Sequence, residues 1–548
     1  MLTEIKGGFR ILANEVIQAT AEARDLLRTR DPKKSRDLYH RSAYINTQVA
    51  LLQKQSMELF LDKGAGYREA LFIQGLSSIA SRLERVSDIL LNLDRQAGYL
   101  SDPVFLKHLK VDDFFHEILD ALARVNPALE KRDVSLAIRL GQVEERLDSY
   151  YAEKFAQIIS ELSQPNPKSG DLVTALMIVH YLERIGDMLL EIGEKIIYII
   201  MGEKIKLEQY KALGAGLKAT GQRLEIGRMG FKSIWGGKSG CRIGVVGSGE
   251  SEEETVLFKH GPAFKLTRER ENLELWQRLR PGLPPAVKAF IPAEIGSEAA
   301  LMLEYIPCRN LQSHFLENDP EEAFRGLSLA LETMASIWRE TLKKVPSRAE
   351  FIRQTENRLS EAKFLYPHLL KYHGAIGNLE IAPLPALLAR LRDLESQNPA
   401  PFSTLIHGDL NLSNILFDPQ ADRIYALDLY RSRENDYVQD VSVLLVSILR
   451  LPVSNPKTRA RLTRAAYLAF NFAKKVAASL GDDAYDARLA FGLARSFLTS
   501  TRFVLEEKIA AKFVARARYL WEKIDAFRLK GRAMEEFRLP WDILNIPL

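Results

Sequence analysis

One stretch of the sequence combines an acid, an amide and a second acid at spacings that suit phosphoryl transfer. Residues 406–417 read Ile-His-Gly-Asp-Leu-Asn-Leu-Ser-Asn-Ile-Leu-Phe, and Asp428 follows fourteen residues after Asn414. Apolar segments flank the polar centre, which predicts strands that hold Asp409 and Asn414 in a loop. Phosphoryl transfer from ATP needs a carboxylate to orient the attacking hydroxyl and oxygen ligands for Mg²⁺. The segment therefore predicts a phosphotransferase site, because a plain strand-turn-strand explains fewer of its positions.

This motif resembles the catalytic core of the aminoglycoside phosphotransferase and choline kinase family. The resemblance implies that Asp409 is the catalytic base, that Asn414 and Asp428 bind Mg²⁺, and that His407 supports the loop. Protein kinases carry His-Arg-Asp where this chain has His-Gly-Asp, so a small-molecule acceptor is implied. The family often has a structural Asp at the start of the next helix. Asp440 stands there, and from the sequence we favour a helix N-cap for it.

A strand lysine is the first candidate for nucleotide binding. Lys259 ends the apolar segment 256–258 and matches the family lysine that contacts the α- and β-phosphates. The alternative is an exposed lysine at the end of a strand. An acid on the predicted helix 266–279 should pair with this lysine. We choose Glu271, and Glu274 and Glu269 stay open.

Two further segments are predicted to hold ATP. A glycine-rich turn at 236–240 precedes a strand, and its backbone N–H groups can cradle phosphate. The residues chosen there are Gly236, Gly237, Ser239 and Gly240, with the turn 247–249 as the rival. Residues 301–306 resemble the hinge between the lobes, so the backbone around Glu304 and Ile306 would bind adenine. The alternative for that segment is an edge strand.

The elements that must position these residues predict a bilobal α+β fold similar to protein kinases. Residues 243–246, 255–259 and 299–306 are short and rich in β-branched or apolar residues, as strands are. Beyond residue 312 the pattern is mostly helical. We therefore expect an N-lobe at 231–310 and a C-lobe at 311–548. Residues 318–401 show no substrate signature, so the acceptor stays open.

The first part of the chain, residues 1–205, predicts an all-helical domain. Leu83, Val86, Leu90 and Leu93 mark one helical face, and breaks fall near 31–32, 64–66, 101–103 and 164–170. Leu-Glu-Arg-Val-Ser-Asp at 83–88 recurs as Leu-Glu-Arg-Ile-Gly-Asp at 182–187, which predicts two duplicated three-helix units. Lysines, arginines and glycines dominate residues 206–230. We expect a solvated basic linker there rather than a phosphate-binding surface.

Both repeats place acids four residues apart: Glu84 with Asp88, and Glu183 with Asp187. Like charges at this spacing repel, so a cation is expected to offset them. Glu191 extends the second stripe. Such a carboxylate face can hold a metal ion, and the alternative is local pairing with arginines such as 85 and 184.

This duplicated motif resembles PhoU, the phosphate-uptake regulator family. The resemblance covers about residues 5–205 and implies two three-helix bundles in tandem, with metal bound at the E-x-x-x-D motifs. It also implies a phosphate-transport or signalling partner. The first motif departs from the pattern, because Arg95 stands where the second copy has Glu194.

Composition bounds the class of protein. The chain has 548 residues, of which 46% are hydrophobic and 27% charged, so more than one globular domain is expected. A net charge of +5 does not indicate a nucleic-acid partner. Two cysteines, Cys241 and Cys308, provide neither a disulfide framework nor a cysteine zinc site. No stretch reaches the ~20 apolar residues that span a bilayer, and residues 1–10 lack a signal-peptide core. We expect a cytoplasmic protein without a transmembrane segment.

Together these features predict a fusion of a PhoU-like regulatory domain and an ATP- and Mg²⁺-dependent kinase that phosphorylates a hydroxyl of a small molecule. The helical domain would sense phosphate status, a metal or a transporter partner. The alternative is a nucleotide-binding regulatory protein without turnover, against which the retained Asp409, Asn414 and Asp428 argue. A kinase acting on protein side chains is disfavoured by the His-Gly-Asp form and by the lack of an Ala-Pro-Glu segment.

Overall fold

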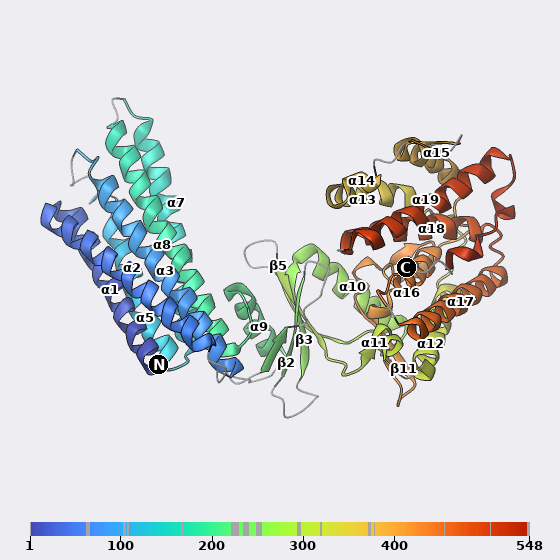
Figure 1. Ribbon diagram of the computed structural model, residues 1–548, viewed down its shortest axis with the longest axis horizontal. Coiled ribbons are helices and arrows are strands. Elements are labelled where there is room, and N and C mark those ends of the chain that lie inside the picture. Colours follow the sequence, from blue (N-terminus) through green and yellow to red (C-terminus); the bar gives the residue numbers. More distant parts are fainter. Residues whose placement is uncertain are drawn as a thin grey trace. The chain divides into compact units, whose positions relative to one another are not determined.

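Figure 1 shows the computed structural model of the chain. It describes residues 2–61, 66–101, 106, 109–165, 168–220, 230–233, 241–247, 255–292, 298–317, 320–370, 374–376, 379–453, 455–504 and 506–544.

The chain packs as two compact units. The first contains residues 1–262 and 289–302, and the second contains residues 263–288 and 303–548. The predicted boundary at 205–231 therefore does not separate the compact units, because the strands that follow it pack with the first one. Among the described residues, no helix combines the length and the apolar character that a membrane crossing requires.

The first unit begins with an antiparallel set of long helices. They are α1 (Leu2–Thr29), α2 (Pro32–Leu61), α3 (Tyr67–Ala97), α5 (Val111–Glu130), α6 (Val134–Gly141), α7 (Val143–Leu162) and α8 (Ser169–Met201). α1, α2 and α3 pack on one another, α5 to α8 do the same, and α3 lies against α8. This is the predicted pair of three-helix units, with the middle helix of the second unit divided at Gln142.

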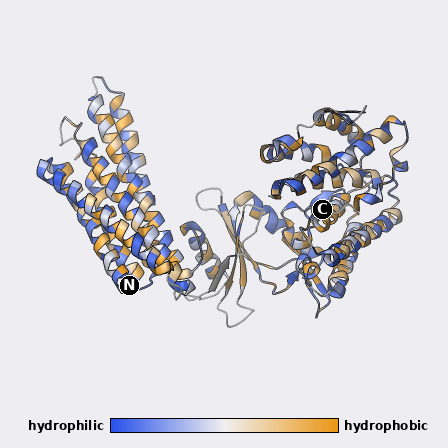
Figure 2. Ribbon diagram, in the orientation of Figure 1, coloured by the Kyte–Doolittle hydropathy of each residue, from blue (hydrophilic) through white to orange (hydrophobic). Residues whose placement is uncertain are grey.

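The helix boundaries follow local residue chemistry. Arg30 adopts positive φ between α1 and α2, and Pro32 then begins α2, where a missing N–H costs nothing. The predicted face of α3 is fully buried, with Leu83, Val86 and Leu90 all at 0% exposure. Figure 2 shows hydrophobic and hydrophilic residues sharing each of these helices, as expected for a bundle with one buried side per helix.

The expected solvated linker contains a packed helix, α9 (Leu207–Ala219), so that expectation was wrong for these residues. Leu207, Tyr210, Leu213 and Leu217 of α9 are buried. They belong to one hydrophobic core with the helical bundle and the neighbouring sheet. The lysines of this segment obscured a periodic apolar face that a helix needs.

A five-stranded sheet follows, with the order β1-β2-β3-β5-β4. Its strands are β1 (Gly230–Ser233), β2 (Arg242–Gly247), β3 (Val256–Pro262), β4 (Val287–Ile291) and β5 (Glu298–Glu304). β1, β2 and β3 pair antiparallel, and Ile243 lies opposite Lys259. The chain passes from β3 into α10 (Ala263–Leu279), which belongs to the second unit.

The second unit is mostly helical around three small sheets. Its strands pair as β11-β10-β6, β12-β9 and β7-β8. The bounds of these strands are β6 (Arg309–Asn310), β7 (Gly374–Ile376), β8 (Leu379–Ile381), β9 (Thr404–Ile406), β10 (Ile415–Asp418), β11 (Arg423–Ala426) and β12 (Arg433–Asn435).

Helices surround these strands (Figure 1). They are α11 (Leu311–Leu316), α12 (Pro320–Glu340), α13 (Phe351–Leu365), α14 (Pro367–Leu370), α15 (Leu384–Gln397), α16 (Val438–Leu449), α17 (Pro456–Ser479), α18 (Tyr485–Ser500) and α19 (Glu507–Leu529). Short 3₁₀ turns occur at Leu412–Asn414, Leu429–Arg431, Thr501–Phe503, Met534–Glu536 and Trp541–Leu544. α16 and α18 are buried along most of their length and pack on each other, so they form the centre of this unit.

Candidate functional site

The loop between β9 and β10 carries the predicted catalytic acid. β9 ends at Ile406 and pairs with β12, while β10 begins at Ile415 and pairs with β11. Two separate strand pairs therefore fix the two ends of the loop. Asp409 lies between them with 23% of its side chain exposed, so it is open enough to meet a substrate.

Gly408 is required by the shape of this loop. Its φ is +82°, a conformation that residues with a Cβ rarely adopt. A Cβ at this position would approach the backbone oxygen of Arg431 to well under 3.0 Å. The glycine of the His-Gly-Asp motif therefore lets two backbone segments come together.

Two partners hold the Asp409 carboxylate. Asn411 Nδ2 donates to Oδ1 at 2.7 Å, and Arg431 Nη1 lies 3.2 Å from Oδ2. Neither Asn411 nor Arg431 was among the predicted site residues. Asn411 stands two positions after Asp409, a spacing that could have indicated it, whereas only the fold brings Arg431 to the loop.

Asp440 anchors the loop from α16. Its two carboxylate oxygens accept hydrogen bonds from the backbone N–H groups of His407 and Gly408, at 2.8 and 2.7 Å. Burial raises the pKa of Asp440 to about 7, although both hydrogen bonds oppose the shift. The N-cap interpretation was wrong, because Asp436 instead accepts from the Val438 N–H at the start of the helix.

His407 is fully buried within the same loop. Its Nδ1 accepts a hydrogen bond from the Asp409 N–H at 3.3 Å, and its ring lies edge-on to Trp276. Burial lowers the pKa of His407, so its ring is neutral at physiological pH. A neutral, packed ring is suited to supporting the loop rather than to proton transfer with a substrate.

The hairpin of β10 and β11 brings the predicted Mg²⁺ ligands to one end. Ile415 pairs with Ala426, and the Leu427 N–H donates to the backbone oxygen of Asn414 at 2.8 Å. Asn414 and Asp428 therefore flank the same end of the hairpin. Asn414 Nδ2 donates to the Asp409 carbonyl at 2.9 Å, which directs its Oδ1 elsewhere. One amide oxygen and one carboxylate are hard donors that fit Mg²⁺.

α10 is tied to the segment after Asp428. Asn272 Nδ2 donates to the backbone oxygens of Leu429 and Ser432, at 2.7 and 3.1 Å. Trp276 Nε1 donates to Ser432 Oγ at 2.7 Å. This helix therefore holds the backbone that presents Asp428.

The three acids of the same helix that were candidates to pair with Lys259 differ in exposure and in pairing. Glu271 is exposed, and it makes no ion pair with any residue in the described part of the chain. Glu274 lies 3.7 Å from Arg270. Glu269 is the buried acid of α10, with 3% exposure, and Lys259 of β3 is also buried, with 6% exposure. Lys259 and α10 belong to different compact units, so the pairing of Lys259 with Glu271 or with an alternative acid of this helix stays a prediction.

The other predicted nucleotide contacts are described only in part. Gly236, Gly237, Ser239 and Gly240 lie outside the described residues, as does most of the rival turn at 247–249. In the hinge segment the Glu304 N–H donates to the Ala286 oxygen, and the Ile306 oxygen accepts from Cys308 N–H, at 2.9 and 2.8 Å. The Glu304 N–H and the Ile306 carbonyl are therefore already hydrogen-bonded within the chain.

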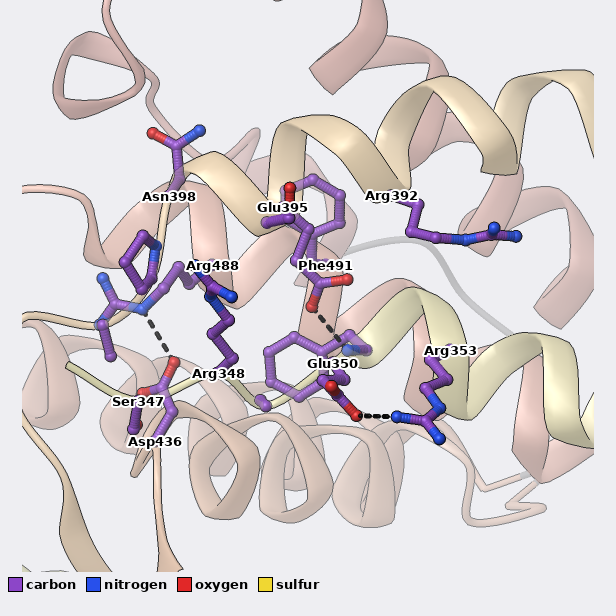
Figure 3. Close-up of a pocket in the computed structure, with 15 residues that line it drawn as sticks. Ser347, Arg348, Glu350, Arg353, Arg392, Glu395, Asn398, Asp436, Arg488 and Phe491 are labelled. Atoms are coloured by element: carbon purple, nitrogen blue, oxygen red, sulfur yellow. Dashed lines mark hydrogen bonds and ion pairs between the residues drawn. The ribbon is translucent and has the colours of Figure 1, made fainter.

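The second unit has a pocket (Figure 3) with a volume of about 230 Å³. Its walls come from the segment 347–353, the end of α15, Asp436, and Arg488 and Phe491 of α18. Figure 3 shows Arg488 paired with Asp436, and Arg353 paired with Glu350. Sequence reasoning missed this pocket, because its lining residues are scattered over some 140 positions without a motif.

Glu395 closes one side of the pocket. Its carboxylate accepts from the backbone N–H groups of Phe351 and Ile352 at 2.5 and 2.9 Å, so α15 supplies the N-terminal cap of α13. Burial raises the pKa of Glu395 to about 7. The side chain is thus a structural cap whose charge depends on pH near neutrality.

The helical bundle gathers acids at its second repeat. Burial raises the pKa of Glu183, and the charge of Asp187 adds to the shift. Glu144 and Asp148 of α7 feel the same Asp187 charge, and the pKa of Glu144 rises to about 7, mainly through burial. Glu144 and Asp148 were not predicted, because they carry no repeat motif.

The predicted bundle acids are partly paired with arginines. In the first repeat the pKa of Glu84 is raised by burial and by Asp88, which lies 3.8 Å from Arg85. Glu191 forms an ion pair with Arg82 of α3. Across the described residues, no three His, Cys, Asp or Glu side chains are grouped so as to hold a metal ion. The metal roles of Glu84, Asp88, Glu183, Asp187 and Glu191 stay predictions.

Comparisons with known proteins give one family match in the N-terminal part of the chain and another in its C-terminal part. The PhoU domain model matches residues 111–196, and the model of Ternary complex associated domain 9 matches residues 331–509. A PhoU homologue of Methanothermobacter thermautotrophicus is 21% identical over 210 residues, which is 37% of this chain and 94% of the relative. A homologue of Streptococcus pneumoniae is 23% identical over 213 residues, 38% of this chain and 96% of the relative.

Solved structures resemble both regions. PhoU of Streptococcus pneumoniae covers 37% of this chain and 97% of its own, with 22% identity and a TM-score of 0.35. An aminoglycoside phosphotransferase of Streptomyces rimosus covers 57% of this chain and 98% of its own, with 16% identity and a TM-score of 0.33. Because these scores are low, the loop and strand geometry of this chain carries the argument for its chemistry. The N-terminal part of the chain is thus similar to PhoU proteins, with residues 111–196 matching the PhoU domain model, and the solved structures similar to its C-terminal part include aminoglycoside phosphotransferases.

Proposed function

We propose that the kinase-like region transfers the γ-phosphoryl group of ATP to a hydroxyl group of a small molecule. The observation that carries the proposal is the Asp409 loop, in which a partly exposed carboxylate is oriented by Asn411 and Arg431 and anchored through Asp440. A carboxylate held in this way can accept the proton of an attacking hydroxyl. The hydroxyl oxygen forms a bond to the γ-phosphorus, the bond to the β–γ bridging oxygen breaks, and ADP leaves.

The other residues would bind and position the nucleotide. Asn414 and Asp428 would hold Mg²⁺, which neutralises charge on the phosphates when it is bound. Lys259 would bind the phosphates. In the hinge segment, adenine would use the Glu304 carbonyl and the Ile306 N–H, since the other two backbone groups are engaged. Catalysis would rest on positioning and charge stabilisation.

The test is transfer of phosphate from ATP, with Mg²⁺, to a panel of sugars, amino alcohols, aminoglycosides and hydroxy acids. Asp409→Asn should lower the rate about 10²–10⁴-fold while leaving nucleotide affinity intact, because it removes the base and keeps the shape. Asp422→Asn is the matched control. It lies at the other end of the same hairpin, and its positive φ suits Asn.

Two results would count against an enzyme. Turnover that is equal in Asp409→Asn and the parent chain would remove Asp409 from the chemistry. Nucleotide binding without any transfer to the panel would favour a nucleotide-binding regulatory protein instead.

We also propose that the PhoU domain adjusts this activity in response to phosphate or metal status. The supporting observation is that the bundle, α9 and the sheet that carries Lys259 share one hydrophobic core. A ligand that shifts the bundle can therefore act on the sheet through packed side chains. We expect this protein to act in the cytoplasm with a phosphate-transport or signalling partner.

A further inference from the structure

Arg495 is a buried cation beside the catalytic loop. The residue is 8% exposed, and its Nε and Nη2 atoms have no hydrogen-bond partner in the described part of the chain. Its guanidinium lies 5.5 Å from the centre of the Phe351 ring, which lines the pocket. Buried guanidinium groups normally donate to carboxylates or backbone oxygens. The Nε and Nη2 atoms of Arg495 could therefore donate hydrogen bonds to a ligand.

Two arginines and two acids act on the charge of Arg495. The pKa of Arg495 is lowered to about 10, first by burial and then by the charge of Arg431, and Arg433 adds to the shift. Asp409 and Glu395 act in the opposite direction. Asp409 is already 3.2 Å from Arg431, and Glu395 is bonded to two backbone N–H groups. Arg495, Arg431 and Arg433 thus share carboxylates that already have other hydrogen-bond partners, and Glu350 acts on Arg433 alone among the three.

A second buried arginine shows that missing partners alone do not mark a site. Arg516 of α19 is 3% exposed, and its Nε, Nη1 and Nη2 atoms also have no hydrogen-bond partner among the described residues. Its guanidinium lies 5.3 Å from the Phe497 ring, and burial alone lowers its pKa. Arg516 therefore lacks the neighbours that distinguish Arg495, which are Asp409 and two further arginines.

The pocket wall has a further cation, Arg348. Arg348 lines it, is exposed, and forms no ion pair with a described residue, whereas Arg353, Arg392 and Arg488 are each paired with an acid. Gln354 of α13 donates to Gln439 at 3.4 Å, and Gln439 donates to the Gly408 backbone oxygen at 3.1 Å, so α13 is linked to the Asp409 loop. The first residues of α13 also line the pocket, so this helix contributes to the pocket and is linked to the loop.

We propose that the acceptor of the phosphotransferase carries an oxyanion group, phosphate or carboxylate, which Arg495, Arg431 and Arg433 bind beside Asp409. This inference rests on the proposed function and names its substrate class. Binding draws Arg431 from the Asp409 carboxylate to the oxyanion, and Oδ2 becomes free to accept the proton of the acceptor hydroxyl. A polycationic acceptor such as an aminoglycoside is disfavoured, because its positive charges would be repelled by these arginines.

Calorimetric titration of the full chain with inorganic phosphate and with acetate tests the oxyanion site. Each titration is run without nucleotide and again with saturating Mg²⁺ and the imido analogue of ATP, which fills the γ-phosphate position. Arg495→Met keeps the side-chain volume and removes the charge, and Arg516→Met is the matched control. Arg433→Gln, an exposed change, covers the case in which the Arg495 variant fails to fold.

The expected result is one binding site for phosphate, acetate or both, which persists when the analogue is bound. Arg495→Met and Arg433→Gln should weaken that binding about ten-fold or more, and Arg516→Met should not. Absence of binding overturns the proposal, as does binding that Arg495→Met leaves unchanged. Binding that the ATP analogue displaces also overturns it, since the arginines would then serve the γ-phosphate.

The two proposals can fail separately. In the transfer assay, Asp409-dependent phosphorylation of neutral or cationic acceptors alone would uphold the phosphotransferase and overturn the oxyanion site. Failure of the chain to bind the ATP analogue would count against the phosphotransferase, while the titration without nucleotide would still decide whether Arg495 binds an oxyanion.

Discussion

At Gly408, the absence of a Cβ atom lets the loop that carries Asp409 approach the backbone of Arg431. The position combines a φ of +82° with close approach to the Arg431 backbone oxygen, and the adjacent Asp409 then reaches Arg431 and Asn411. A Cβ would have to push the Arg431 backbone away. Because Asp440 fixes the neighbouring N–H groups, the loop has little room to relax.

Gly408→Ala should therefore destabilise the protein by about 3 kcal/mol, from left-handed strain plus overpacking. It should also abolish transfer. Gly481→Ala is the control, because Gly481 has a φ of +67° but no described atom within 4 Å of the position that a Cβ would take. That change should cost about 1 kcal/mol and leave transfer intact. Thermal unfolding and the transfer assay measure both; equal losses in the two variants would show that the contact with Arg431 is unimportant.

At the scale of elements, α13 begins with a cap that another helix provides. Glu350 has positive φ and gives no side-chain cap, so the first N–H groups of α13 are satisfied by Glu395 of α15. This arrangement ties the two helices that line the pocket. It also makes their junction sensitive to pH, because the carboxylate is buried.

The folded-state pKa of Glu395 is raised to about 7 from 4.5, so folding favours its protonated form. Its contribution to stability is complete below pH 4.5 and is lost as pH rises through about 7. The loss amounts to about 3 kcal/mol for this buried group. Glu395→Gln should remove this pH dependence, which urea unfolding at pH 4.5 and 7.5 measures.

Glu332→Gln, an exposed change on α12, should retain the parent pH dependence. If Glu395→Gln follows the parent curve between these pH values, the carboxylate is already ionised in the folded protein and the interpretation of the cap is wrong.

At the scale of the whole chain, the domains predicted from the sequence and the compact units of the structure have different boundaries. The helical bundle, α9 and most of the five-stranded sheet form the first unit, although β1 to β3 follow the predicted linker. α9 supplies the link within this core. Gly216 of α9 lies so close to Met302 of β5 that a Cβ there would clash. The helix is therefore packed against the sheet, not tethered beside it.

Leu213→Ala, at a position with 0% exposure, should cost about 2–5 kcal/mol through the cavity it leaves. Because the core is continuous, hydrogen exchange should accelerate in β3, β5 and α8 as well as in α9. Lys218→Ala on the exposed side of α9 is the control. Acceleration confined to α9 would show that the bundle and the sheet are not coupled through this helix.

The sequence alone predicted most of the helices and strands and the loop that carries the motif. Helical periodicity and the repeated Leu-Glu-Arg motif predicted the tandem bundles, and the breaks at 31–32 and 164–170 lie where helices end. These features are local, since a turn or a buried helical face depends on residues close in sequence. The order His-Gly-Asp, Asn414 and Asp428 likewise predicted the loop and the hairpin.

Tertiary structure decided which side chains meet. Asp440 was expected to cap its own helix, yet it binds the backbone at residues 407 and 408, and Arg431 reaches Asp409 only because β12 pairs with β9. Arg495 and the pocket lie far along the chain from the motif. Burial distinguished Glu269 from Glu271 on one helix. Such choices depend on long-range packing, which removes charges from water and forces them to find partners that sequence spacing does not specify.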